Sequence, residues 1–127
     1  MNLHINTTAH DEIILKLEKD DKFLAIKKIK APRTQAEKLL PAIDKLLSSK
    51  NIKLSQLKKI IVASYGGSFT SLRIGVITAN ALAYALNIPV EAEEKNQKNI
   101  KKFSGYSIVE PIYDREPNIG ISKKPKL

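Results

Sequence analysis

Residues 64–75, SYGGSFTSLRIG, decide how the rest of this chain can fold. They follow the run KKIIVAS at 58–64, whose nearly continuous apolar character is typical of a buried parallel strand. They open an Ala-rich segment that we expect to be a helix from about residue 70 to residue 86. The helix should end at Asn87, a residue that adopts the left-handed conformation of many helix termini. The stretch is therefore a strand-to-helix junction.

The rest of the chain supplies four more strands and a second helix. The segment IPVEA at 88–92 follows the helix as a strand, which makes a right-handed strand–helix–strand crossover. Alternating apolar and polar residues with short turns predict an antiparallel meander at 2–6, 12–19 and 22–30. A leucine and isoleucine stripe predicts a helix at 34–49. The fold class is α/β, a mixed five-stranded sheet with two main helices.

The helix expected at 34–49 carries two local signals. Thr34 and Glu37 have the spacing of a capping box, in which the threonine hydroxyl accepts from a free backbone amide of the first turn. Pro41 lies inside the apolar pattern, removes one backbone hydrogen bond and should kink the helix.

Composition narrows the classes of function. A length of 127 residues suits one domain, or one domain and a tail, and the absence of cysteine excludes disulfides and thiolate metal sites. No long uncharged apolar stretch or secretory signal is visible, so we expect a cytoplasmic protein that does not enter a membrane. The net charge is +9, but only 3 of the 22 basic residues are arginines and the lysines are spread out. A lysine-coated surface therefore explains the charge better than direct RNA contact.

The composition changes after residue 92, which divides the chain into a lobe at 1–92 and a remainder at 93–127. The segment EEKNQKNIKKF is polar, and the residues after it contain turn-forming glycines and prolines, among them Gly105 and Pro111. We expect a short helix or a linker there, followed by an extended tail that lies on the lobe.

The glycines of the junction allow two interpretations. Gly66 and Gly67 precede a helix, whose free amides and positive dipole end favour phosphate. Alternatively, they adopt left-handed backbone angles while Ser68 caps the helix through its hydroxyl. No lysine stands at the P-loop position, which favours the structural interpretation. In it, Phe69 packs the helix start onto the core, and Arg73 holds the loop by bonding carbonyls or an acid of a partner.

One face of the helix at 70–86 predicts a protein partner. Gly75, Ala79 and Ala83 recur every fourth residue, and small residues at this spacing let another helix approach closely. The alternative is that this face packs only against the helix at 34–49 of the same chain. Opposite residues, Ile74 and Ile77 among them, would face the sheet. The expected partner contacts lie on both helices: Leu39, Ile43, Leu46, Leu72, Gly75, Val76, Ala79 and Ala83.

The segment GGSFTSLRIGVITANALAYALNIPV resembles the signature of the TsaB family, which reads roughly G-P-G-S-F-T-G-L-R-I-G before an Ala-rich helix. LHINTT and TQAEKLLPAI resemble the opening strand and first helix of the family, and EPIYDREP resembles its C-terminal segment. Three positions differ, because Asn6, Gly66 and Ser71 stand where the family has Asp, Pro and Gly. The signature residues that match are Gly67, Ser68, Phe69, Thr70, Leu72, Arg73, Ile74 and Gly75.

The resemblance implies an actin-like, ribonuclease-H-like lobe without chemistry of its own. Members of the family pair with the catalytic subunit TsaD through a four-helix bundle of first-lobe helices, in the synthesis of threonylcarbamoyladenosine in tRNA. The ATPase TsaE joins that assembly, and the contact with tRNA is indirect. A homodimer through the same helices is an alternative state. Usual members are longer, so the resemblance implies a shortened form without most of the second lobe, with no cofactor and no metal.

The residues agree with a protein that is not an enzyme. Asn6 is neutral and would be a poor metal ligand where a carboxylate is expected. His4 falls in a strand and His10 in a turn, and neither has partners with catalytic spacing. Two rival functions stay open: a nucleotide- or phosphate-binding half-lobe, and a small basic RNA-binding protein, which the scarcity of aromatic residues disfavours.

Overall fold

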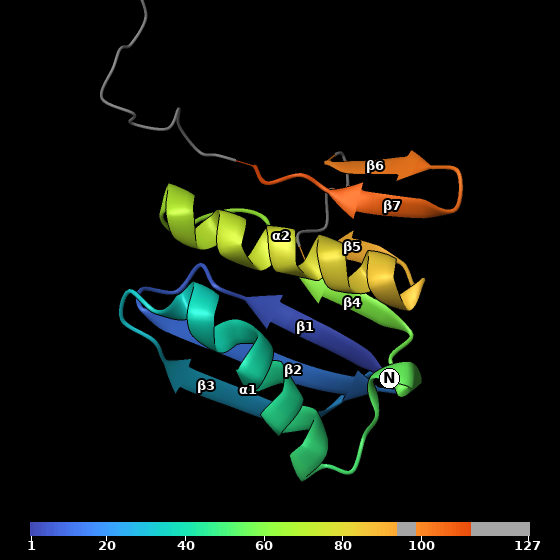
Figure 1. Cartoon of the computed structure of the whole chain (residues 1–127), viewed down its shortest axis with the longest axis horizontal. Helices are drawn as coiled ribbons and strands as arrows, with labels where there is room; N and C mark the ends of the chain where they lie inside the picture. Colours follow the sequence, from blue (N-terminus) through green and yellow to red (C-terminus); the bar gives the residue numbers. More distant parts are fainter. Residues whose placement is uncertain (94–98, 113–127) are drawn as a thin grey trace, which may run out of the picture.

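A five-stranded mixed sheet forms the centre of the molecule, with the strand order β3-β2-β1-β4-β5 (Figure 1). The computed structural model describes residues 1–93 and 99–112. The meander strands pair antiparallel, whereas β4 pairs parallel with β1 and β5. The strands are β1 (Asn2–Asn6), β2 (Glu12–Lys19), β3 (Lys22–Lys30), β4 (Lys59–Val62) and β5 (Val90–Ala92). This confirms the predicted α/β class and the strand–helix–strand crossover.

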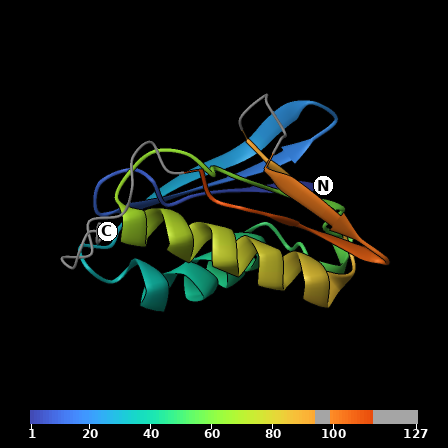
Figure 2. The same cartoon turned by 90° about the horizontal axis from the view of Figure 1, so that it is seen from above.

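Two helices, α1 (Gln35–Ser49) and α2 (Phe69–Leu86), cover the same face of the sheet (Figure 2). The 3-10 turn η1 (Leu54–Gln56) leads from α1 into β4. The core lies between the helices and the sheet, and its largest fully buried side chains are Leu3, Ile5, Ile13, Leu15, Leu17, Leu39, Ile43, Ile60 and Leu72. The alternation of buried and half-buried residues along β1 and β2 explains this layering, because one strand face meets the helices.

The predicted capping box at the start of α1 does not form. Thr34 makes no side-chain capping bond, and its Oγ1 is buried without a hydrogen-bond partner among the described residues. The reason is the preceding turn, in which the Thr34 amide donates to Ala31 O at 3.0 Å and Arg33 has φ 60°. Thr34 therefore has φ −129° and ψ 18°, outside the extended conformation that a capping residue needs. The helix continues through Pro41 to Ser49.

A two-stranded hairpin, β6 (Ile100–Phe103) and β7 (Tyr106–Val109), packs beside α2 and β5 (Figure 1). The sequence predicts only an extended tail here. Gly105, with φ 87°, supplies the tight turn that folds this part of the tail back on itself. The described residues of the tail therefore form a sheet of their own, while residues 94–98 and 113–127 lie outside the described part.

Helix α2 is long and apolar enough, by length and composition, to cross a membrane. In the structure it contacts β1, β4, β5 and β7. A helix that covers a sheet can meet the same criterion.

Candidate functional site

The glycine junction packs against the turn that follows β1. Gly66 and Gly67 have φ angles of 96° and 73°, so both adopt the left-handed conformation that the sequence predicts. A methyl group added at Gly67 would lie 2.6 Å from Thr8 O and 2.8 Å from Thr8 Cα. This lack of space requires glycine at position 67, whereas Gly66 meets nothing within 4 Å.

The first turn of α2 follows the structural interpretation in part. Ser68 Oγ accepts from the Ser71 amide at 3.0 Å, which confirms the predicted helix cap. Phe69 lies at the surface, and the Arg73 guanidinium sits 5.0 Å from its ring centre. The expectation that Phe69 packs onto the core is therefore wrong, because its ring lies under Arg73 in a cation–π pair. Thr70 lies beside them on the same turn.

A buried threonine from the end of β1 joins α2. Thr7 Oγ1 accepts from the Gly75 amide at 3.1 Å and donates to Ser71 O. The hydroxyl thus bridges the donor and acceptor of one helical turn, and Thr7 is 1% exposed. A methyl group at Gly75 would lie 2.6 Å from Thr7 Oγ1, so the glycine is explained by a contact within the chain.

Asn6, which the sequence marked only as a departure from the family's Asp, and Gln35, which it did not mark, organise the same corner. Asn6 Oδ1 accepts from the Thr8 amide at 2.7 Å and from Thr8 Oγ1 at 2.6 Å. Gln35 Nε2 donates to Thr7 O at 3.0 Å and to Glu12 O at 2.7 Å, which ties the start of α1 to this turn. Turn-forming polar residues after a strand were the available signal for Asn6, whereas nothing in the pattern marks Gln35.

The predicted partner-contact residues are buried inside this chain. The small residues at every fourth position of α2, Gly75, Ala79 and Ala83, face the sheet. Ile77 is exposed and Ile74 is half-buried. The predicted orientation of α2 is therefore wrong, because its small residues allow a close approach to the sheet and to Thr7. The buried residues are Leu39, Ile43, Leu46, Leu72, Gly75, Val76, Ala79 and Ala83.

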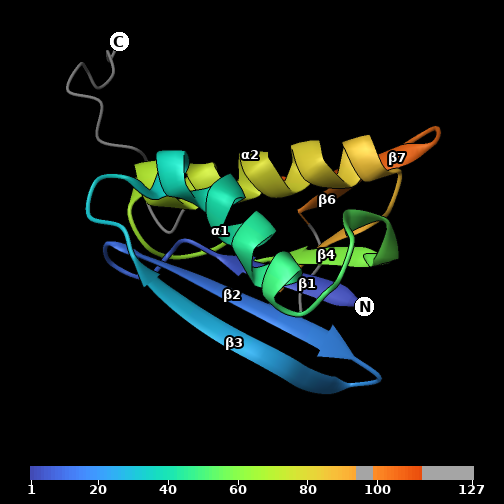
Figure 3. The ribbon, with the colours of Figure 1, turned by 60° about the horizontal axis from the view of Figure 1, so that its bottom comes forward.

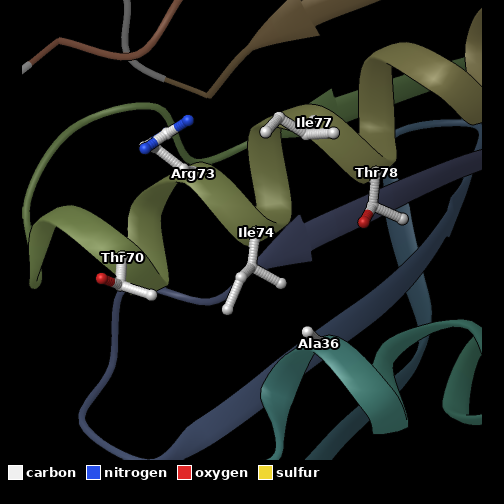
Figure 4. Close-up of a pocket in the computed structure, with 6 residues that line it drawn as sticks. All are labelled: Ala36, Thr70, Arg73, Ile74, Ile77 and Thr78. Carbon is white, nitrogen blue, oxygen red and sulfur yellow. The ribbon is translucent and has the colours of Figure 1, made fainter.

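An apolar face of both helices points away from the sheet instead. Leu40 of α1 is 55% exposed and Ile77 of α2 is 58% exposed. Between the helices lies a hollow of about 320 Å³, shown with its lining side chains in Figure 4. Ala36 comes from α1, and the other lining residues come from α2: Thr70, Arg73, Ile74, Ile77 and Thr78. The signature residues Thr70, Arg73 and Ile74 thus lie on this outer face.

The hairpin is bonded to α2 and to the end of β4. Asn80 Nδ2 donates to Val109 O and Asn80 Oδ1 accepts from the Val109 amide, both at 2.8 Å. Asn99 Nδ2 donates to Ser64 Oγ at 2.9 Å and to Glu110 O at 2.6 Å. Val109 is 1% exposed and belongs to the core. The segment 99–112 is therefore held to the lobe by polar side chains that its sequence pattern does not reveal.

Among the described residues, both histidines lie beside a carboxylate. His4 Nε2 lies 2.8 Å from Glu18 Oε1 on the uncovered face of the sheet, and His10 Nε2 lies 3.0 Å from Asp11 Oδ2 at the surface. The hydrogen bond with His4 is the main cause that lowers the pKa of Glu18. Within residues 1–93 and 99–112, no three His, Cys, Asp or Glu side chains gather as metal ligands.

The family model described as TsaD, tRNA N6-adenosine threonylcarbamoyltransferase, matches residues 26–96. The chain is 35% identical over 85 residues to the tRNA threonylcarbamoyladenosine biosynthesis protein TsaB of Bacillus subtilis (strain 168). That match covers 65% of this chain and 36% of the relative. The protein of the same name in Haemophilus influenzae is 35% identical over 60 residues, which cover 47% of this chain and 25% of the relative.

A solved structure, YeaZ from Pseudomonas aeruginosa, superposes with a TM-score of 0.65 at 30% identity. The superposition covers 72% of this chain and 42% of YeaZ. The chain thus spans about a third of the first curated relative and less than half of this solved structure. The sheet order, the glycine junction and these matches agree, and the chain belongs to the TsaD family of actin-like folds as a protein of the TsaB type.

Proposed function

We propose that this protein is a non-catalytic scaffold subunit in the synthesis of threonylcarbamoyladenosine in tRNA. Its partner is TsaD, which it binds through the outer faces of α1 and α2, and the assembly works in the cytoplasm. The names of its curated relatives support the pathway. The two-helix layer of the fold supports the mode of pairing, because the resemblance to TsaB implies a bundle of two helices from each partner.

The exposed apolar face of the helices is the observation that carries this proposal. Leu40 and Ile77 are more than half exposed, and the hollow between α1 and α2 beside Ile74 offers a place for a side chain of a partner (Figure 4). Exposed apolar residues next to a hollow are typical of a protein interface. The small exposed residues Ala81 and Ala85 continue the face and permit a close helix approach.

A role without chemistry is supported by how the polar groups are used. Asn6 Oδ1 accepts two hydrogen bonds from Thr8. The hydroxyls of Thr7 and Ser68 form hydrogen bonds with the backbone of α2. Thr8 occupies the space that a side chain at position 67 would need. These groups hold the turn after β1 against the start of α2. This structural role accounts for the residues of the signature loop, so no substrate is needed to explain them.

The test is native mass spectrometry of this chain, alone and mixed with TsaD from the same organism. We expect a one-to-one complex, which replaces any homodimer. Ile77→Glu places a charge on the proposed interface and should weaken the complex by at least about tenfold. Leu54→Glu is the matched control, since Leu54 is 43% exposed on η1, outside this face.

Three outcomes would contradict the proposal. The first is a complex that Ile77→Glu and Leu54→Glu weaken equally. The second is tight, magnesium-dependent ATP binding by the isolated chain, which would favour the nucleotide-binding rival. The third is tRNA binding by the isolated chain that falls steeply with salt, which would favour the RNA-binding rival. Circular dichroism of each variant shows whether the fold is retained.

A further inference from the structure

A groove between β3 and α1 has an apolar floor and a basic rim. Its volume is about 560 Å³, larger than the hollow between the two helices. The floor contains Ala25 and Ile29 of β3 with Pro41, Ala42 and Leu46 of α1. Four lysines line the same groove: Lys27, Lys38, Lys45 and Lys50.

The strand beside this groove is a free edge of the sheet. Among the described residues, β3 pairs with β2 on one side and with no strand on the other (Figure 3). It has nine residues, and Phe23, Leu24 and Ile26 are at least half exposed. An edge of this length presents a row of backbone donors and acceptors that can pair with another extended chain.

The lysines of the groove are not neutralised. No acidic residue lines the groove, and within residues 1–93 and 99–112 none of its four lysines forms an ion pair. Lysines elsewhere do find partners, since Lys59 lies 3.3 Å from Glu91 and Lys101 lies 3.4 Å from Glu110. The basic rim of the groove is therefore available to carboxylates from outside the chain.

We propose that the β3–α1 groove binds an acidic, extended segment of a partner protein, which adds a strand to β3. Backbone hydrogen bonds to the free edge supply affinity, and every second side chain of the segment reaches the groove. Apolar side chains meet the floor, while carboxylates meet the lysine rim. This site lies on the side of α1 away from α2 and does not depend on the pairing proposed above.

Two other occupants fit the observations less well. A second copy pairing antiparallel through β3, centred on Ile26, would set Lys22 opposite Lys30 and bring together two chains of charge +9. Single-stranded RNA would find neither an arginine nor an aromatic ring among the residues that line the groove. The unpaired lysines favour an acidic occupant, and the free edge of β3 favours an extended one. Together they indicate an acidic peptide.

The first experiment measures the fluorescence anisotropy of a synthetic peptide as long as β3. Valine and glutamate alternate at every second position of the peptide, with threonine between them, so that both kinds of side chain face the groove. The full chain should bind this peptide more weakly as salt rises. The double variant Lys27→Glu/Lys45→Glu should bind at least about tenfold more weakly. The control Lys53→Glu/Lys58→Glu carries the same charge change at two exposed lysines outside the groove and should keep most of the affinity.

The second experiment asks whether the peptide adds as a strand. Two versions of the peptide are N-methylated at alternate residues, one on each edge. Only one edge can face β3, so one version should lose binding and the other should retain it. Hydrogen exchange should show new protection of β3 amides when the unmodified peptide is bound.

Each contrary result overturns the proposal in a recognisable way. Equal loss in both charge variants, or equal binding of both N-methylated peptides, would mean that only general surface charge attracts the probe. Single-stranded RNA that displaces the peptide from the unchanged protein, and whose own binding is lost in Lys27→Glu/Lys45→Glu, would make the groove a nucleic-acid site. Protection of β3 amides that depends on protein concentration without peptide would identify a second copy as the occupant.

Discussion

The hydroxyl of Thr7 sets the distance between β1 and α2. It bridges Ser71 O and the Gly75 amide, and the space it occupies is the space that a side chain at position 75 would need. The glycine of the signature is thus explained by one close contact inside the lobe. An apolar pattern cannot reveal this contact, because its two partners are 68 residues apart.

Replacing Gly75 with alanine should destabilise the fold, although helix propensity alone favours alanine by about 1 kcal/mol. The added methyl group would meet Thr7 Oγ1 at 2.6 Å, and such overpacking costs about 1–3 kcal/mol. Urea unfolding of Gly75→Ala measures the change. In a Thr7→Ala background the cost of Gly75→Ala should shrink, and an unchanged cost would show that this contact is not the cause. Gly75→Leu adds a larger side chain at the same place and should destabilise the monomer more.

The Glu18 carboxylate predicts a loss of stability in acid. Its pKa is lowered, first by the hydrogen bond with His4, so the stabilisation is present above the ordinary pKa of glutamate. It is lost as pH falls through the lowered value. The free energy of unfolding should therefore drop as the pH falls below the ordinary pKa of glutamate, and Glu18→Gln should reduce that drop. Glu37→Gln, at an exposed position, is the control, and an equal effect there would contradict the assignment.

At the scale of elements, α2 shows why sequence predicts a helix better than its orientation. The length of the helix and the Asn87 terminator are clear, and Asn87 has φ 58° as expected. Both faces of the helix are apolar, however, so hydrophobic periodicity does not say which face meets the sheet. Small residues permit close packing against either a partner or the sheet, and in the structure Gly75 and Ala79 pack against the sheet side.

Asn80 should control whether the hairpin stays on α2. Its amide donates to and accepts from the Val109 backbone, so Asn80→Ala leaves both groups without these partners. A buried polar group without a partner costs about 1–3 kcal/mol. Hydrogen exchange at Val109 should become faster in Asn80→Ala, while amides of β1 and β2 keep their protection. Unchanged exchange at Val109 would mean that other contacts hold the hairpin.

For the whole molecule, the five strands of the main sheet could be predicted, whereas their order and the attached hairpin could not. The meander and the crossover follow from alternation, turns and continuous apolar runs, which are local in sequence. The hairpin joins segments far apart, through Asn80 with Val109 and through Ser64 with Asn99. Its strands contain the basic pair Lys101 and Lys102, and a charged tail gives no apolar pattern to read.

The boundary expected after residue 92 can be tested by truncation. Val109 belongs to the core of the lobe, and burial of a valine is worth about 1.5–3 kcal/mol. A chain of residues 1–93 should therefore be less stable to urea than a chain of residues 1–112, by at least about 1.5 kcal/mol. Equal stability of the two chains would support residues 1–92 as a lobe that needs no tail.

The parallel pairing of β1 with β4 also has a kinetic consequence. Residues 2–6 must find residues 59–62, while the meander and α1 can form from neighbouring segments. Pairings between distant segments slow folding, so closing β1 on β4 should limit the rate of refolding. Lengthening the exposed connector around Asn51 should slow refolding only slightly, because even doubling a loop costs about 0.6 kcal/mol. A substitution within β4 that weakens its pairing with β1 should instead slow refolding, and a larger loss of stability should give a larger decrease in the refolding rate.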